Sequence, residues 1–278
     1  MTRNSKLETH NSMKSPAYMA AHIRRVLKDG GSAPHSAEVQ WFFKEQIKSH
    51  GWYTDDLRKL AARFRKVLLH DCGLDYLVQV ADKLFDSEVL EEKGMAVLIL
   101  QKSVPEFGKK EFKLFESWLS RICSWADHDA LVQYLIGPMI AGPTSAKRTT
   151  QRVPHPSPQG RVRSYLPSVF RWAKSRDRWH RRAAAVALLR GNRRQMFFDE
   201  IVRVSEMLLS DKDDMVQKGL GWLLREAAKY NREKTVPYLM TTRDRAPRLV
   251  LRTACETLPP ELKTKILGTQ PKRRAAAR

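Results

Sequence analysis

The chain has few of the patterns on which metal and nucleotide sites depend. Only three of its 278 residues are cysteines, with no Cys-x-x-Cys pair, and its eight histidines are scattered without a His-Glu-x-x-His motif. No metal site is therefore predicted. The phosphate-binding pattern Gly-x-x-x-x-Gly-Lys-Ser/Thr and the dinucleotide fingerprint Gly-x-Gly-x-x-Gly are also missing, so no cofactor is expected.

Long apolar runs are missing as well. The longest, Ala183 to Leu189, is far too short to span a bilayer, and the N-terminus has no uninterrupted apolar segment of the signal-peptide kind. The cysteines Cys72, Cys123 and Cys255 are odd in number and lie in or beside apolar helical patterns, which predicts reduced, buried thiols. We therefore expect a soluble cytoplasmic protein with no membrane partner.

What the chain has in excess is positive charge. Lysine and arginine total 51 against 30 aspartates and glutamates, a formal charge of +21 that is well beyond what solubility requires. The cations are spread along many predicted helices rather than gathered in one basic amphipathic segment, which favours nucleic acid over a membrane surface as the partner. A hydrophobic fraction of 42% is enough for a core of ordinary size.

Apolar periodicity predicts one helix after another, and no segment shows sustained strand alternation. The predicted helices are Pro16–Leu27, Ala37–Ser49, Thr54–Leu69, Leu74–Phe85, Glu88–Ser103, Lys110–Ile122, Trp125–Ile140, Leu166–Lys174, Trp179–Leu189, Gln195–Leu209, Asp213–Tyr230, Val236–Met240, Pro247–Leu258 and Glu261–Leu267. Paired helices recurring about every 35 to 45 residues favour an all-α, HEAT-like helical repeat solenoid. A helix bundle is the alternative.

Composition divides the chain into a helical domain and three polar segments. Residues 1–14 read as a mobile tail, residues 15–268 as the helical domain, and residues 269–278 as a basic C-terminal tail. Within the domain, residues 141–163 form a basic insertion rich in Pro, Gly, Ser and Thr. The insertion and the C-terminal tail are each either a flexible arm that meets phosphates or a solvated segment.

The predicted helix Asp213–Tyr230 separates apolar from basic residues. At about 100° per residue, the apolar side chains share one side: Val216, Leu220, Leu223, Leu224 and Ala227. The other side carries a tryptophan among cations: Lys218, Trp222, Arg225 and Lys229. This stripe would bind phosphates and lay the indole against a sugar or base; the alternative is that Trp222 packs under a neighbouring helix beside a solvated basic rim. Gly219 and Gly221 each cost a helix interior about 1 kcal/mol relative to Ala, which close approach of another helix or of a DNA backbone would offset.

A second feature lies at the start of the helix predicted from residue 125. Trp125 and Asp129 are four residues apart and share one helix face. Asp127, three residues after Ser124, suits a first-turn capping role, whereas Asp129 lies too far into the helix for that role. From the spacing alone, Trp125 is either a core residue with Asp129 a solvated acid, or the two form part of a site.

Four segments resemble the AlkD-like DNA alkylation repair family, which are DNA glycosylases built from HEAT-like repeats. They are SWxxxD at Ser124–Asp129 followed by an apolar run to Gly137, WHRRAA at Trp179–Ala184, VQKGLGWLLREAAK at Val216–Lys229, and GWxTxxLR at Gly51–Arg58. The resemblance covers the chain from about Glu38 to Leu267. It implies a solenoid with a concave basic face.

The resemblance also implies an activity: hydrolysis of the glycosidic bond of cationic alkylated purines, of the 3-methyladenine and 7-methylguanine type, in duplex DNA. It assigns to Asp129 the stabilisation of an oxocarbenium-like sugar and the positioning of water, flanks Asp129 with Trp125 and Trp222, and makes Arg182 a phosphate contact beside the reaction centre. Further expected DNA contacts are Lys218, Arg225, Lys229, Arg181 and Arg252.

No signature of a nucleophilic lysine is evident, so a monofunctional enzyme without a lyase step is expected, acting as a monomer. The competing interpretation is a non-catalytic HEAT-like module that binds damaged or branched DNA. A protein-binding helical scaffold is a third, but it gives no reason for the charge of +21.

Overall fold

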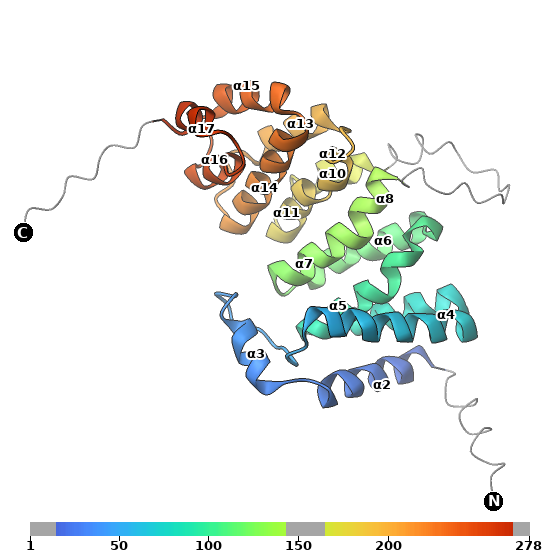
Figure 1. Ribbon diagram of the computed structural model, residues 1–278. Helices are drawn as coiled ribbons and strands as arrows, with labels where there is room; N and C mark the ends of the chain where they lie inside the picture. The colour runs from blue at the N-terminus through green and yellow to red at the C-terminus, as the bar shows by residue number, and fades with distance from the viewer. Residues whose placement is uncertain (1–14, 143–164, 269–278) are drawn as a thin grey trace, which may run out of the picture. The chain divides into compact units, whose positions relative to one another are not determined.

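The computed structural model describes residues 15–142 and 165–268, and these residues are helical with no strand longer than the isolated bridge between Lys48 and Val89 (Figure 1). The all-α prediction is therefore confirmed. The predicted tails at residues 1–14 and 269–278, and all of the predicted insertion beyond Gly142, lie outside the described ranges.

Contacts between residues divide the chain into two compact units, residues 1–136 and 137–278, which are described separately. The expectation of one domain over residues 15–268 and of a concave basic face stays a prediction.

The first unit consists of helices and short helical turns that overlap predicted helices, although the one predicted over Ala37–Ser49 is displaced and shortened. They are α2 (Pro16–Asp29), α3 (Ala33–Gln40), α4 (Thr54–Phe85), α5 (Leu90–Leu100), η1 (Gln101–Glu106), α6 (Lys109–Trp118), η2 (Leu119–Arg121), α7 (Trp125–Leu131) and the π-helical turn η3 (Val132–Ile136). Helix α4 packs against α5 and α2. It contains Gly73 at φ 80°, which interrupts the helix where the sequence predicts a break between two helices.

The core of this unit is built where α4, α5 and α6 meet. Phe85 at the end of α4 stacks on Trp118 at the end of α6, with 4.3 Å between ring centroids, and both side chains are fully buried. The indole of Trp118 donates a hydrogen bond to Asp82 at 2.8 Å, so its one polar group is satisfied.

The predicted helix Ala37–Ser49 is wrong. The helix in this region begins earlier, with Ser32 as N-cap and Pro34 in its first turn, and it ends at Gln40. The chain leaves the helix through turns, in which Trp41 N donates to the carbonyl of Glu38 and Phe42 N to that of Val39. The side chain of Gln40 then holds the non-helical segment: its amide oxygen accepts from Ile47 N at 3.0 Å, and its amide nitrogen donates to the carbonyl of Glu45 at 3.0 Å.

Beyond this segment, a buried carboxylate holds the chain against α5. The oxygens of Glu91, which is 3% exposed, accept hydrogen bonds from the backbone nitrogens of His50 at 2.8 Å, Gly51 at 2.9 Å and Trp52 at 3.2 Å, and from the hydroxyl of Ser49 at 2.6 Å. A buried charge with four donors is well satisfied. Glu91 therefore fixes the path of the chain between α3 and α4.

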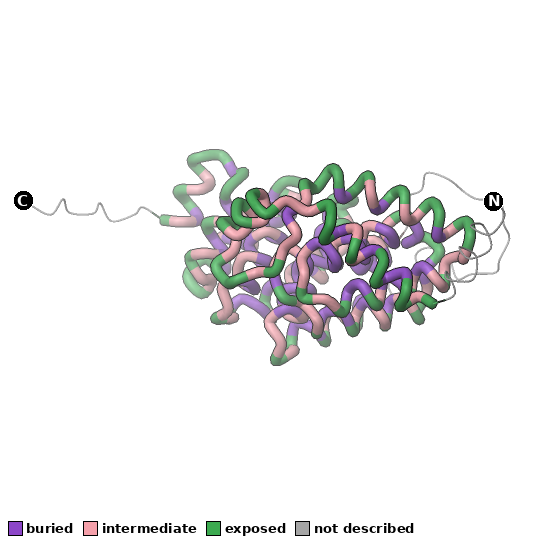
Figure 2. The backbone as a smooth tube through the Cα atoms, turned by 90° about the horizontal axis from the view of Figure 1, so that it is seen from below, coloured by how far each residue is buried: buried purple, intermediate pink, exposed green. Residues whose placement is uncertain are grey.

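The second unit surrounds one long helix, α14 (Asp214–Tyr230), which packs against α11, α13, α15 and α16. The other helices of this unit are α8 (Gly137–Ala141), α10 (Leu166–Trp172), α11 (Arg178–Val186), α12 (Leu189–Asn192), α13 (Phe198–Leu208), α15 (Arg232–Thr242), α16 (Arg248–Ala254) and α17 (Pro260–Leu267). Each overlaps a predicted helix, although α12 shares only Leu189 with the helix predicted over Trp179–Leu189. Buried and exposed residues alternate turn by turn along the helices, as amphipathic periodicity requires (Figure 2).

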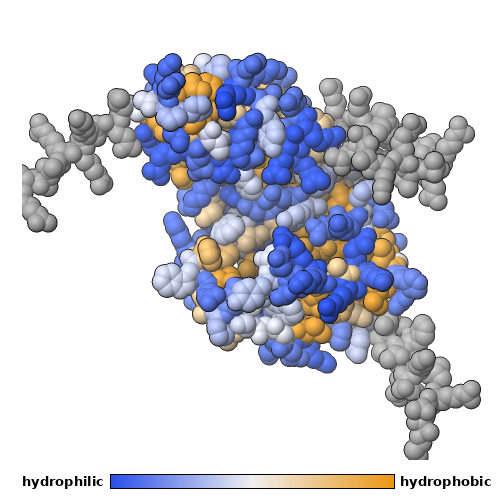
Figure 3. Space-filling model, in the orientation of Figure 1, coloured by the Kyte–Doolittle hydropathy of each residue, from blue (hydrophilic) through white to orange (hydrophobic). Residues whose placement is uncertain are grey.

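Hydrophilic side chains cover much of the face seen in Figure 3, with smaller apolar areas between them. Within residues 15–142 and 165–268, no helix has both the length and the apolar character needed to cross a membrane. The three cysteines are free, but only Cys255 is buried; Cys72 is half-buried and Cys123 is exposed. The prediction that all three are buried is wrong, because solvent reaches Cys123 in the link between η2 and α7 and reaches part of Cys72 on α4.

Candidate functional site

Helix α7 begins at the predicted cap. The side chain of Asp127 accepts hydrogen bonds from the backbone nitrogens of Ser124 at 2.7 Å and of Cys123 at 2.9 Å, and the hydroxyl of Ser124 accepts from Asp127 N. This is the reciprocal capping box, which confirms the role predicted for Asp127. The amine of Lys93 lies 3.9 Å from the same carboxylate, and both side chains are 1% exposed. Asp127 is thus a structural group, and the next acid along the helix is Asp129.

The carboxylate of Asp129 is held by its neighbour in the chain. The Nδ1 atom of His128 lies 2.7 Å from Oδ1 of Asp129; the imidazole is 0% exposed and the carboxylate 13% exposed. An ionised carboxylate only accepts hydrogen bonds, so the ring nitrogen donates when Asp129 is charged. Asp129 is therefore not the solvated acid that the alternative interpretation requires. His128 had no sequence signal, because adjacent residues on a helix do not ordinarily face each other.

Trp125 is half-buried and has an aromatic partner that the sequence did not indicate. Phe43 stacks on it with 5.0 Å between ring centroids and an interplanar angle of 18°. Phe43 belongs to the non-helical segment after α3, where a helix was predicted. An internal aromatic residue therefore supports the indole.

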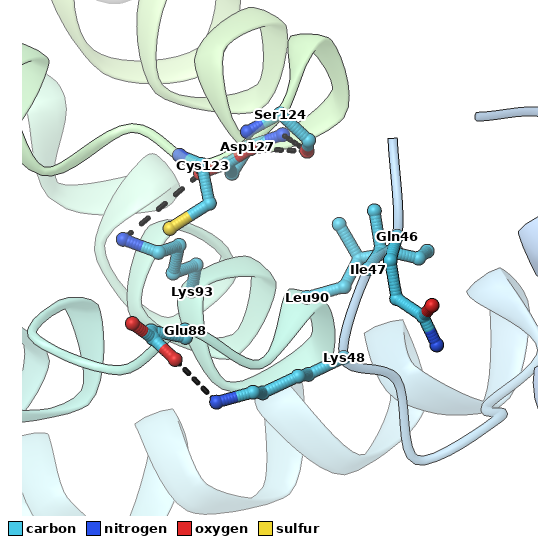
Figure 4. A pocket seen from close by; sticks show the side chains of 9 residues that line it. All are labelled: Gln46, Ile47, Lys48, Glu88, Leu90, Lys93, Cys123, Ser124 and Asp127. Carbon is cyan, nitrogen blue, oxygen red and sulfur yellow. Dashed lines mark hydrogen bonds and ion pairs between the residues drawn. The ribbon is translucent and has the colours of Figure 1, made fainter. Parts of the chain in front are cut away.

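A cavity of the first unit lies beside this helix start rather than at Asp129. It has a volume of about 230 Å³ and is lined by Gln46, Ile47, Lys48, Glu88, Leu90, Lys93, Cys123, Ser124 and Asp127 (Figure 4). Neither Trp125 nor Asp129 lines it.

The charged side chains of this cavity are occupied by structural contacts. Lys48 forms an ion pair with Glu88 across its mouth, and Lys93 donates to the carbonyls of Phe85 and Arg121. Burial lowers the pKa of the Lys93 amine. We therefore do not place the reaction in this cavity.

In the second unit, α11 carries both predicted phosphate contacts, Arg181 and Arg182, and their side chains lie in different surroundings. Its N-cap Asp177 accepts from Trp179 N at 2.8 Å, and Trp179 is 8% exposed. Arg181 connects two loops: it donates to Asp211 at 2.6 Å and to the carbonyls of Ser175 at 3.0 Å and Arg176 at 2.8 Å. A phosphate bound by Arg181 would have to replace one of these acceptors.

Arg182 is 5% exposed and lies between α11 and α14. Its Nη1 donates to the carbonyl of Met215, in the first turn of α14, at 2.6 Å. A Cβ atom placed on Gly219 would come within 3.1 Å of Cγ of Arg182, so glycine is what leaves room for this side chain. The close approach proposed to offset the cost of Gly219 is therefore an approach of α11.

Helix α14 has the predicted two sides. The five predicted apolar residues are all buried, and Trp222 is half-buried. The cations of the stripe are engaged in ion pairs: Lys218 with Asp214 at 3.0 Å, Arg225 with Glu256 at 2.5 Å and Lys229 with Glu226 at 2.7 Å. Lys218 and Lys229 keep side chains that are 40% exposed, so solvent, or a phosphate, can reach both.

Helix α16 packs on the opposite flank of α14. A Cβ atom on Gly221 would lie 2.7 Å from Cβ of Thr253, so this glycine too permits a close helix contact. Arg252, the neighbouring residue on α16, is exposed.

The candidate residues fall into both units: Trp125 and Asp129 on α7 of the first, Arg182 and Trp222 on α11 and α14 of the second. Within the part of the chain that the structure describes, no three His, Cys, Asp or Glu side chains are grouped as metal ligands would be. The candidate residues of the first unit offer a carboxylate and an aromatic face, and those of the second unit offer an aromatic face and cations.

Comparisons with known proteins agree on one family. Residues 23–258 match the family model described as DNA alkylation repair enzyme. The fold is similar to that of a solved protein from Enterococcus faecalis described as a predicted DNA alkylation repair enzyme, with a TM-score of 0.67, 17% sequence identity, and coverage of 83% of this chain and 97% of that one. No curated protein matches the chain significantly.

Proposed function

Because the chain belongs to the DNA alkylation repair enzyme family, we propose that it is a monofunctional DNA glycosylase that removes cationic alkylated purines, such as 3-methyladenine and 7-methylguanine, from duplex DNA. The observation that carries this proposal is the environment of Asp129. Its carboxylate is 13% exposed and hydrogen-bonded to a fully buried histidine, an arrangement that orients a charged group within reach of solvent.

The chemistry needs little more than such a carboxylate. Alkylation at N3 or N7 makes the purine cationic, so the bond from C1′ to the base breaks with its electron pair going to the base, which leaves neutral. Positive charge then develops on the sugar, where Asp129 stabilises it and orients a water molecule that adds to C1′ and loses a proton. No general acid is needed, because the leaving group is already activated.

The two tryptophans have supporting roles in this proposal. The faces of Trp125 and Trp222 attract a cationic nucleoside or its sugar, an interaction of about 1 to 2 kcal/mol when desolvated. Stacking of Phe43 on Trp125 supports the first of these roles, because it restrains the indole before DNA binds. For Trp222, partial exposure on the basic side of α14 is the supporting feature.

Duplex DNA is the proposed partner, bound through its phosphates. The supporting features are the charge of +21 and the exposed cations on α14 and α16, including Lys218, Lys229 and Arg252. Binding by Lys218, Lys229 or Arg225 exchanges a carboxylate partner for a phosphate. Arg181 and buried Arg182 already donate to internal acceptors, so a phosphate contact by either would exchange one of those bonds for a bond to phosphate.

The test is release of 7-methylguanine from a duplex that carries it at one position, scored by alkaline cleavage at the resulting abasic site. Wild type is compared with Asp129→Asn, which keeps the shape and removes the charge. Asp75→Asn is the matched control, because Asp75 is in the same unit and its side chain is 86% exposed. We expect release by wild type and the control, and a loss of at least about 100-fold in Asp129→Asn.

Two results would count against the proposal. Full activity of Asp129→Asn would remove Asp129 from the mechanism. No release by wild type, together with salt-sensitive duplex binding, would make the protein a non-catalytic HEAT-like module for damaged or branched DNA.

A further inference from the structure

Two consecutive aromatic residues project into solvent directly after α3. Trp41 is 91% exposed and Phe42 is 75% exposed, the highest values among the large hydrophobic residues of the described chain. We call these two residues the aromatic tip. Neither the catalytic proposal nor the phosphate contacts above makes use of them, and side chains of this size are ordinarily buried at least in part.

The aromatic tip stands on a braced segment. Besides its bonds to Ile47 and Glu45, the Gln40 amide donates to the carbonyl of Phe43 at 3.4 Å, which closes the turn that carries the tip. Phe43, the residue that follows the aromatic tip, stacks on Trp125 of α7. The exposed pair is therefore held by contacts on both sides, and ordering it on binding costs less than ordering a free loop.

The chemistry of the aromatic tip fits the bases of DNA. The neighbouring Lys44, Glu45 and Lys48 are all exposed, and Lys48 is paired with Glu88, so the positive charge that would meet phosphates is that of the protein as a whole, +21, and not of this segment alone. This combination binds unpaired bases by stacking and the adjoining phosphates by charge. The protein's formal charge of +21 favours this polyanionic partner over another protein.

Bases inside an intact duplex already stack on one another and leave no open face. A planar side chain gains contact only where that stacking is interrupted, or where it wedges a base step apart. We propose that the aromatic tip stacks on DNA bases at an interruption of the duplex, such as the position beside a missing or displaced base, and so directs the protein toward damaged sites. This inference rests on the proposed function only in taking DNA as the partner.

The test measures DNA binding and not base release, so its result can be interpreted even if the protein proves to have no glycosylase activity. The full chain is titrated with two duplexes of one sequence, intact or carrying a tetrahydrofuran abasic analogue, over a range of salt concentrations. The variants are Trp41→Ala/Phe42→Ala, which removes both rings, and Trp41→Phe/Phe42→Trp, which keeps them. Tyr18→Ala is the matched control, because Tyr18 is an aromatic residue of the same unit that is 55% exposed on α2.

We expect wild type to prefer the interrupted duplex and the double alanine variant to lose that preference by about tenfold, the order expected for loss of one stacked base. The slope of log affinity against log salt should be unchanged, because no charge is removed. The aromatic exchange and Tyr18→Ala should behave as wild type. Thermal unfolding of the double alanine variant should also be unchanged, since both side chains are exposed.

Several outcomes would overturn the inference. These are a wild type that binds neither duplex or both equally, a double alanine variant that keeps the preference, or an equal loss in Tyr18→Ala. A reduced salt slope in the double alanine variant would also overturn it, because that would show that the segment acts through phosphates.

Discussion

Replacing Gly221 by alanine sets two opposing effects against each other. In a helix interior, alanine is favoured over glycine by about 1 kcal/mol. At this position, however, the new Cβ would lie 2.7 Å from Cβ of Thr253 and 3.2 Å from the carbonyl oxygen of Val250, both on α16. These atoms are fixed to the backbone, so α16 as a whole must move, and overpacking of this kind costs about 1 to 3 kcal/mol. With the cost at the upper end of that range, we expect a net destabilisation of about 2 kcal/mol.

Gly94 provides the matched control. It lies inside α5, and an added Cβ would meet only Cδ2 of Leu57 at 3.5 Å, an ordinary contact. Gly94→Ala should therefore stabilise the protein by about 1 kcal/mol. Equilibrium urea unfolding followed by circular dichroism measures both variants, and the two free energies of unfolding should differ by about 3 kcal/mol, the sum of the two opposite changes. If Gly221→Ala is as stabilising as Gly94→Ala, contact with α16 is not the reason for this glycine.

Three further predictions concern charged groups. His128→Leu should slow release of 7-methylguanine by about tenfold without weakening duplex binding, because the hydrogen bond that orients Asp129 is lost; an unchanged rate would show that His128 has no such role. Burial lowers the pKa of Lys93 below its usual 10.5, so between the folded pKa and 10.5 the unfolded chain binds more protons. The free energy of unfolding of wild type minus that of Lys93→Met, measured by urea unfolding, should thus rise as the pH increases toward 10.5. A difference that falls over this pH range would contradict the lowered pKa. Arg252→Ala should reduce the salt slope of DNA binding, measured by filter binding, by about one without loss of stability. Arg182→Ala should instead lower the free energy of unfolding by about 1 to 3 kcal/mol, because the carbonyl of Met215 loses its donor. If Arg182→Ala changes the salt slope and Arg252→Ala changes stability, the two roles are exchanged.

Features that depend on neighbours along the chain could be predicted from the sequence. The buried and polar sides of α14 follow from a helical period, and the cap of α7 follows from Ser124 and Asp127 being three residues apart. The break at Gly73 in α4 is local in the same sense. The excess of positive charge, which points to nucleic acid, is a property of composition and needs no structure at all.

Features that depend on contacts between distant segments could not. The apolar residues around Trp41 have a pattern that favours a helix, but Gln40 closes the chain into a turn and Phe43 finds its partner on α7. The same holds for Gly219 and Gly221, whose cost in the sequence is plain but whose reason is the approach of α11 on one flank and α16 on the other. The sequence by itself determined where most helices form, apart from the segment after Gln40, and which side of each is apolar, because those depend on residues three or four positions apart. Only the tertiary structure decided which aromatic residues are left in solvent and which arginine is buried, because each of these depends on what another segment covers.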